Sequence, residues 1–231
     1  MKTIGLIGGM SFESTITYYQ VINEVINQKF GGLSSAKCIL YSVNFQEIEK
    51  CQKIGDWAKS AKILSEAGLA LQKAGADFIL ICTNTMHKVF DEVQESINIP
   101  LIHIADVTFN ELEKNKIKKV ILLGTKYTME QDFYKQRIIK KGIDVIVPDE
   151  VERQEINRII FEELCKGVIK KDSKEFFLKV IKRLEEKGAE GVIFGCTEIG
   201  LLINKNDVKT LVFDTALIHA KEAALMLIEN N

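Results

Sequence analysis

Two cysteines of this chain occupy matching points in a repeated pattern, and each is followed by threonine. The first copy spans residues 75–84 and ends in Cys82-Thr83-Asn84. The second spans residues 188–198, ends in Cys196-Thr197-Glu198 and has one extra residue before its cysteine. Each copy reads as a Gly-Ala turn, an acidic residue, an apolar β-rich run and then the Cys-Thr pair. The repeat therefore predicts two thiols in equivalent structural settings.

Two thiols that reach one carbon from opposite sides can remove a proton from one face and return a proton to the other. One sulfur must be a thiolate and the other a thiol, and a free cysteine has a pKa of about 8.5 that a helix N-terminus lowers. Because a polar residue that could open a helix follows each cysteine, we expect helix N-termini beside both sulfurs. Their N–H groups would also bind a substrate carboxylate. The pattern predicts a cofactor-independent racemase or epimerase with Cys82 and Cys196 as its acid/base pair.

Other interpretations of the reactive side chains are less well supported. A cysteine that ends an apolar strand is commonly a small core residue, and this reading applies to Cys38, Cys51 and Cys165, which lack the repeated setting. Cys82 and His87 have a spacing that could hold a metal, but no companion ligands follow, so no metal site is predicted. Two further alternatives remain. A cysteine could pair with His103 or His219, but neither histidine lies in a recognisable sequence motif. A dinucleotide could bind at Gly5, Gly8 and Gly9, but their spacing is not that of the dinucleotide-binding motif.

Strand-like and helix-like segments alternate along the whole chain, which favours an α/β fold. The apolar runs do not alternate with polar residues, as expected for parallel sheets covered on both faces. Helical periodicity is clearest over residues 15–28 and 57–73. The predicted strands begin near Thr3, Lys37, Phe78, Leu101, Val120, Val145, Val192 and Leu211.

The duplication extends beyond the cysteines and predicts two pseudo-symmetric lobes, each a mostly parallel sheet flanked by helices. Residues 3–9 resemble residues 119–125, and each segment opens its half. We place the first lobe at residues 1–115 and the second at 116–213, with a C-terminal helix of about 214–231 packing back on the first lobe. Ligands of parallel sheets bind beyond the carboxyl ends of the strands, so the active site is expected in a cleft between the lobes.

Composition restricts the class of partner. Apolar residues make up 46% and charged residues 27% of the chain, as in an ordinary globular protein. A net charge of −1 indicates neither nucleic acid nor an anionic membrane as a partner. No run is long enough to span a membrane, and the short, glycine-broken apolar start is unlike a signal peptide. The five cysteines are an odd number, so we expect free thiols in a cytoplasmic protein.

With these residues in view, the chain resembles the aspartate/glutamate racemase family, and within it the bacterial broad-specificity amino-acid racemases. The resemblance covers essentially the whole sequence. It is carried by IGLIGGMSFEST from Ile4, CTNTMHK from Cys82, LLGTKYTMEQDFY from Leu122, IFGCTEIGLLI from Ile193 and VFDTALIHA from Val212.

The resemblance implies a pyridoxal-phosphate-independent two-base racemase of small amino acids that uses no cofactor and commonly forms a homodimer. It gives Cys82 and Cys196 the acid/base roles. Lys166 matches a lysine that some relatives use near the distal carboxylate of the substrate, and a solvated lysine is the alternative. The implied substrate-binding residues are Thr83, Asn84, Thr85, Thr125 and Thr197, with backbone help from Met10 and Ser11.

Two residues depart from the pattern of the family, and one of them bears on the choice of substrate. Phe12 stands where many relatives carry tryptophan, which we expect to affect packing only. Some aspartate racemases have an arginine after the second strand, whereas residues 44–53 contain none and Gln52 stands in its place. An amide offers hydrogen bonds without charge, so neutral substrates such as homoserine join aspartate and glutamate as candidates. Two alternative functions stay open: a related isomerase or decarboxylase of small dicarboxylic acids, and a non-catalytic amino-acid-binding protein.

Overall fold

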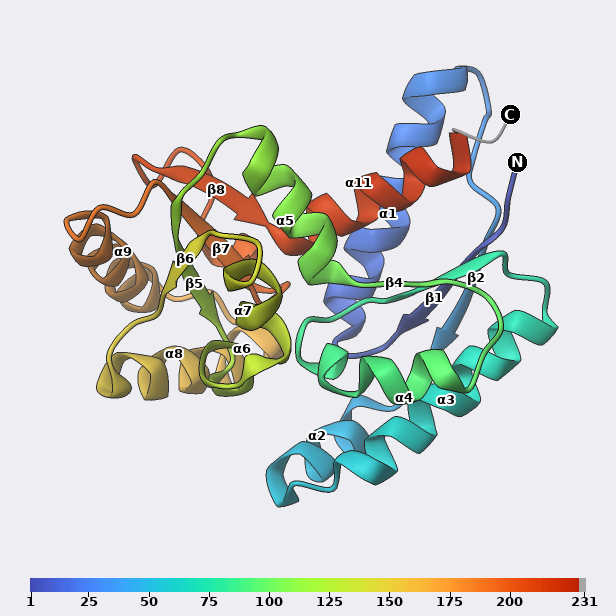
Figure 1. The fold of residues 1–231 in the computed structure, drawn as a ribbon, viewed down its shortest axis with the longest axis horizontal. Coiled ribbons are helices and arrows are strands. Elements are labelled where there is room, and N and C mark those ends of the chain that lie inside the picture. The colour runs from blue at the N-terminus through green and yellow to red at the C-terminus, as the bar shows by residue number, and fades with distance from the viewer. Residues whose placement is uncertain (229–231) are drawn as a thin grey trace. The chain divides into compact units, whose positions relative to one another are not determined.

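The computed structural model describes residues 1–228 and contains two four-stranded parallel sheets (Figure 1). The strand order is β2-β1-β3-β4 in the first sheet and β6-β5-β7-β8 in the second. The second order is the first with each strand number raised by four, so the repeat seen in the sequence is also a repeat of topology. The predicted α/β fold with parallel sheets is confirmed.

Every strand begins within one residue of its predicted start. The apolar runs are short, rich in β-branched residues and bounded by turn residues, which is why their positions could be predicted. The strands are β1 (Ile4–Gly8), β2 (Cys38–Ser42), β3 (Phe78–Ile81), β4 (Leu101–Ile102), β5 (Lys119–Gly124), β6 (Asp144–Ile146), β7 (Gly191–Gly195) and β8 (Leu211–Asp214).

Burial divides the strands by their place in the sheet. The central strands β1, β3 and β7 are buried at every residue, and β5 is buried after Lys119. The outer strands β2, β6 and β8 are partly exposed, because each has a neighbouring strand on one side only. A central strand has neighbours on both sides as well as helices on both faces, whereas an outer strand leaves one edge open.

Several helices begin after a polar side chain that caps them. Ser11 caps α1, which includes the predicted 15–28, and Asp56 caps α3, whose bounds match the predicted 57–73. Within the described residues, no helix is both long and apolar enough to cross a membrane. The helices are α1 (Phe12–Phe30), α2 (Phe45–Ile54), α3 (Trp57–Lys73), η1 (Thr85–Val89), α4 (Phe90–Glu95), α5 (Ile104–Lys114), α6 (Lys126–Glu130), α7 (Asp132–Ile139), α8 (Glu150–Glu162), η2 (Leu164–Lys166), α9 (Lys171–Glu185), α10 (Ile199–Leu202) and α11 (Thr215–Ile228).

The chain forms two compact units. Unit 1 comprises Met1–Ile104 together with the chain from His219, and unit 2 comprises Ala105–Ile218. The division therefore falls at the start of α5, whereas the sequence placed it after residue 115. Most of α11 belongs to unit 1, and residues 229–231 of the predicted C-terminal helix lie outside the described part of the chain.

Unit 1 has three layers, with α2, α3 and α4 on one face of its sheet and α1 and α11 on the other (Figure 1). On the first face Ile7 and Ile81 pack in one apolar cluster with Leu64 and Leu71 of α3. The second face buries Tyr18 of α1 and residues of α11 that include Ala220, Ala223 and Leu227. The apolar stripes of these helices supply the core that fixes the ends of β1 and β3.

Unit 2 builds its main core in the same way. Ile121 and Leu123 of β5 and Phe194 of β7 pack with the apolar sides of α8 and α9. Cys196 belongs to this cluster, as do Phe177 of α9 and other residues of that helix. The second cysteine is thus part of the apolar core of unit 2.

Candidate functional site

Cys82 follows the last residue of β3 and is held by backbone hydrogen bonds. Its N–H donates to the carbonyl of Ile7 in β1 at 2.9 Å, and its own carbonyl accepts from Ser14 Oγ of α1 at 3.4 Å. The side chain is 0% exposed. The first cysteine is therefore fixed by a neighbouring strand and by the first turn of a helix.

We call each cysteine together with the residues that contact it a corner. The loop after β1 lies beside the Cys82 corner. Met10 and Ser11 are buried, and Ser11 caps α1 by accepting a hydrogen bond from the Ser14 N–H. Ser14 Oγ in turn donates to the carbonyl of Ser11 as well as to that of Cys82. Ser14 thus connects the two loops, and Ser11, which the family resemblance assigned to substrate binding together with Met10, lies near Cys82.

The residues after Cys82 form a turn and the short helix η1. Thr83 is half-buried, while Asn84 and Thr85 are buried. Gln52 of α2 is also buried, and its amide Nε2 donates to the sulfur of Met86 in η1 at 3.2 Å. Gln52 is therefore part of the same corner of unit 1 through its contact with η1.

Cys196 follows β7 in unit 2 and contacts a carboxylate. The Cys196 thiol donates to Glu198 Oε2 at 2.9 Å, and the Thr197 hydroxyl donates to the same oxygen at 2.9 Å. Cys196 is 7% exposed and Glu198 is 3% exposed. From the sequence, Glu198 was predicted only as a possible helix cap. The signal that could have singled it out is the change from Asn84 to Glu198 at the third position of otherwise matching motifs.

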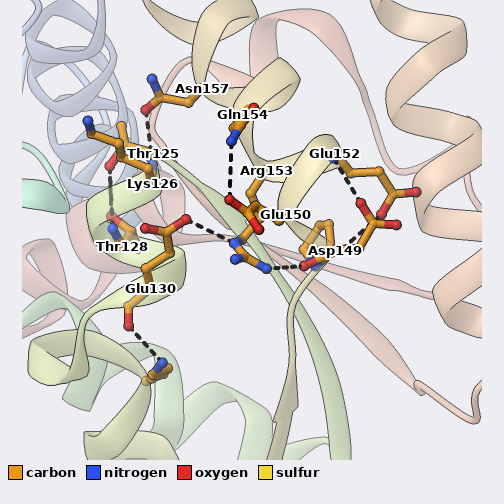
Figure 2. Close-up of polar contacts among 12 residues, drawn as sticks. Thr125, Lys126, Thr128, Glu130, Asp149, Glu150, Glu152, Arg153, Gln154 and Asn157 are labelled. Carbon is orange, nitrogen blue, oxygen red and sulfur yellow. Dashed lines mark hydrogen bonds and ion pairs between the residues drawn. The ribbon is translucent and has the colours of Figure 1, made fainter.

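Thr125 follows β5, the strand next to β7, and begins α6 (Figure 2). It caps this helix by accepting from the Thr128 N–H. Helix α8 holds α6 in place, because Asn157 Oδ1 accepts from the Lys126 N–H at 3.0 Å and Arg153 Nε donates to Glu130 Oε1 at 3.0 Å. Side chains of α8 thus fix the residue that the sequence assigned to substrate binding.

Helix α8 is itself well anchored at its start. Asp149 accepts from the Glu152 N–H at 3.0 Å, and the Glu152 carboxylate accepts from the Asp149 N–H at 3.1 Å (Figure 2). This reciprocal capping box satisfies two of the N–H groups that a helix start leaves open.

Lys166 lies at the end of η2, which contacts α10, the helix after the Cys196 motif. It is exposed and precedes Gly167, which has the left-handed conformation that ends the turn. Its neighbour Cys165 packs against the apolar cluster that contains Cys196. The structure therefore places Lys166 one residue from a neighbour of that cluster, and its role stays a prediction.

The two cysteines are offset by one residue relative to their sheets. Cys82 comes directly after Ile81, which lies opposite Ile7 of β1. In unit 2 the pairing continues one step further, so that Gly195 lies opposite Gly124 before Cys196 begins. The extra residue seen in the second sequence copy is thus accommodated inside β7.

Both thiols are protonated at neutral pH. Burial raises the pKa of Cys82, and at Cys196 burial and the negative charge of Glu198 raise the pKa well above its usual value. The prediction that helix N-termini lower these pKa values was wrong. The following segments, η1 and α10, have only five and four residues, and neither Asn84 nor Glu198 makes a side-chain capping hydrogen bond.

The three histidines of the chain are buried together in unit 1. Ring centroids are 4.6 Å apart for His87 and His103 and 5.9 Å apart for His87 and His219. His87 Nδ1 donates to the Thr83 carbonyl at 2.8 Å, and its Nε2 accepts from the Ile104 N–H at 3.2 Å. Both nitrogens of His87 are engaged by the backbone. Across the described residues, no group of three or more His, Cys, Asp or Glu side chains is arranged to hold a metal ion.

The hydrogen bonds of His219 are satisfied by a neutral ring. Its Nε2 donates to the Ile102 carbonyl at 3.1 Å, so Nδ1 accepts from the Tyr18 hydroxyl at 2.9 Å. Burial, and then the nearby His87, hold the pKa of His219 well below its usual value. This histidine is neutral in the folded chain under conditions where an exposed histidine is charged.

We expect His219 to make the protein less stable in mild acid. Below about pH 6.5 the unfolded chain binds a proton at this residue and the folded chain does not. The free energy of unfolding should therefore fall by about 1.4 kcal/mol between pH 7.5 and pH 5.5 on account of His219. Urea unfolding of wild type and His219→Gln at both pH values measures this share, and an identical pH dependence in the two proteins would contradict it.

Residues 7–223 match the family model described as Asp/Glu/hydantoin racemase. The chain belongs to this family. The match includes both Cys-Thr pairs, the whole of β3, β5 and β7, and the end of β1.

Solved structures of relatives have the same fold. The crystal structure of a "putative Asp/Glu racemase" from Yersinia pestis is 53% identical, with a TM-score of 0.92 over 99% of this chain and 100% of that one. An aspartate racemase homologue from Pyrococcus horikoshii OT3 is 43% identical, with a TM-score of 0.84 over 99% and 100% of the two chains. Among curated proteins, the broad specificity amino-acid racemase RacX of Bacillus subtilis (strain 168) is 22% identical over 221 residues, which cover 94% of this chain and 95% of RacX.

Proposed function

We propose that this protein is a cofactor-independent amino-acid racemase in which Cys82 and Cys196 exchange protons with the α-carbon of the substrate. The observation that carries the proposal is the presence of a Cys-Thr pair at the carboxyl end of the third strand in each of two sheets with the same topology. Membership of the Asp/Glu/hydantoin racemase family supports it.

The reaction needs one thiolate and one thiol acting on opposite faces of the same carbon. The thiolate takes the α-proton, the electron pair that remains is spread over the substrate carboxylate, and the thiol supplies a proton from the other side. An α-proton is far less acidic than a thiol, so groups that stabilise the developing negative charge contribute most of the rate. We assign this to the hydroxyl, amide and backbone N–H groups of Met10, Ser11, Thr83, Asn84, Thr85, Thr125 and Thr197.

The arrangement of positive charge favours a broad choice of small polar substrates. No arginine precedes Arg137 in the sequence, so unit 1 has none before α5. The arginines of unit 2 are engaged in ion pairs: Arg137 with Asp106, Arg153 with Glu130, Arg158 with Glu155 and Arg183 with Glu152. Gln52 offers the Cys82 corner a buried amide without charge. We therefore propose that homoserine is turned over along with aspartate and glutamate.

The test is a racemisation assay with the purified chain and no added cofactor. L- and D-aspartate, glutamate and homoserine are incubated separately, and loss of optical rotation is followed in heavy water together with deuterium at Cα. Racemisation of at least one pair, with deuterium entering at Cα, is the expected result. We expect homoserine to be turned over with a kcat/KM within about tenfold of that for aspartate, because a single charge contact contributes on the order of 1 kcal/mol when it is not fully buried.

A panel in which every amino acid keeps both its rotation and its α-proton would refute the racemase. Saturable binding of the same compounds without exchange would instead favour the amino-acid-binding alternative. The same samples should be measured after dialysis against a chelator and after gel filtration, so that an activity due to a contaminating cofactor-dependent enzyme is recognised.

A further inference from the structure

The two Cys-Thr motifs differ at their third residue, and the difference creates a contact in unit 2. Glu198 Oε2 accepts hydrogen bonds from the Cys196 thiol and the Thr197 hydroxyl, both at 2.9 Å. The glutamate is only 3% exposed. At the corresponding place after Cys82 the chain has Asn84. A carboxylate can take a proton from a thiol, whereas an amide can only share a hydrogen bond with it.

We propose that Glu198 is the proton acceptor that converts Cys196 into its thiolate, so that Cys196 is prepared as a base by its own unit. This rests on the proposed racemase function. Glu198 acts on the substrate through Cys196, and its role is therefore one of activating and positioning the sulfur.

The proton balance of the cycle is closed. The S–H bond of Cys196 breaks, its electron pair stays on sulfur, and an O–H bond forms on Glu198. The thiolate then takes the α-proton, and the Cys82 thiol gives its proton to the other face of the carbon. The proton held by Glu198 passes to solvent and Cys82 recovers one from solvent, which restores the starting state. No oxidant or reductant takes part.

The resting state and the active state differ in charge. At rest the proton lies on sulfur, because burial and the charge of Glu198 raise the pKa of Cys196. The ammonium group of a bound amino acid brings a positive charge, which favours the thiolate. Transfer to Glu198 is then a move of about one hydrogen-bond length between atoms already in contact.

The test measures exchange of the α-proton for deuterium in variants that keep one cysteine each. Cys82→Ala leaves Cys196 as the only base, and we expect it to exchange the α-proton of one enantiomer without inverting it. Adding Glu198→Gln to this variant should slow that exchange about 100-fold, the low end of what a positioned acid or base contributes. Adding Glu198→Gln to Cys196→Ala should leave the exchange of the other enantiomer within twofold, which shows that the chain still folds.

A conservative replacement separates proton transfer from mere support of the loop. In the Cys82→Ala background, Glu198→Asp keeps a carboxylate and should retain more exchange than Glu198→Gln. The Gln variant should recover as the pH rises from 7 to 9, because solvent can then deprotonate Cys196 directly. Glu175→Gln on α9 changes an exposed glutamate and serves as the matched control with unaltered exchange.

Two outcomes would overturn the proposed role of Glu198 and leave the proposed racemase function intact. If Glu198 only raises the pKa of Cys196, its replacement by glutamine increases the thiolate fraction and speeds exchange in the Cys82→Ala background. Equal slowing in both single-cysteine backgrounds would indicate a general structural role. Failure of wild type to racemise any amino acid of the panel would instead remove the racemase, and with it this proposal.

Discussion

Replacing either Cys82 or Cys196 by alanine is expected to lower racemisation by roughly 10⁴-fold, the upper end of the contribution of a positioned acid or base. Each variant removes one of the two thiols that we propose to act on opposite faces of the α-carbon, and in that proposal Glu198 reaches the substrate only through Cys196. The interconverted enantiomers have equal free energy, so kcat/KM must fall by the same factor for both directions. Polarimetry started from each enantiomer measures the two rates.

Cys38→Ala is the matched control for the loss of a thiol. Cys38 is half-buried at the start of the outer strand β2, so its removal should leave the racemisation rate within about twofold. Circular dichroism of all three variants checks that they fold. Retained racemisation in either Cys82→Ala or Cys196→Ala would refute the two-base assignment, whatever the control shows.

The signals for the strands and helices of this fold lie in short segments of the sequence, so the positions of these elements could be predicted from it. Each strand is a short apolar run between turn residues, and α3 runs from its Asp56 cap to Lys73 as the periodicity indicates. The sequence does not distinguish central strands from outer strands, because both are apolar. The exposure of β2, at Leu40 and Tyr41 for example, depends on which strands end up as neighbours, and that is decided by contacts distant in the chain.

The chemistry of the two corners was predicted less completely than their positions. The motifs placed Cys82 and Cys196 at strand ends because strand and turn signals are local. The protonation state of the thiols depends on burial and on Glu198, neither of which can be read from spacing. A helix of four or five residues is also too short to supply the positive end that the sequence argument assumed. The local prediction of a lowered pKa therefore gave the wrong sign.

The protonated resting thiols are the reason we propose an activating role for Glu198, which is in contact with Cys196. With both sulfurs protonated, catalysis needs a step that creates a thiolate before the α-proton can be removed. Unit 2 has a carboxylate in contact with its sulfur, while the third position of the motif in unit 1 is the amide of Asn84. The two sheets thus share one topology, while the third residue of the motif is an amide in unit 1 and a carboxylate in unit 2.

Gly9→Ala is expected to be the most destabilising single change in the loop that precedes α1. Gly9 has a φ of 86°, and a Cβ at this position would lie 2.3 Å from the carbonyl oxygen of Val43 and 2.6 Å from Ser42 Oγ. The left-handed conformation costs an alanine about 1–2 kcal/mol, and the overlap with backbone adds about 1–3 kcal/mol. We therefore expect the free energy of unfolding to fall by about 2–5 kcal/mol, measured by urea unfolding.

Gly55→Ala separates the two contributions to this loss. Gly55 ends α2 in the left-handed conformation, with φ 76° and ψ 19°, but a Cβ there meets nothing within 4 Å, so only the conformational cost of about 1–2 kcal/mol applies. The difference between the two variants is the cost of forcing β1 and the segment after β2 apart. Because the Gly9 N–H also donates to Thr15 Oγ1 at 2.8 Å, that displacement would move the start of α1, and with it Ser14 and the carbonyl of Cys82. Equal losses in the two variants would show that the backbone contact at Val43 does not constrain this loop.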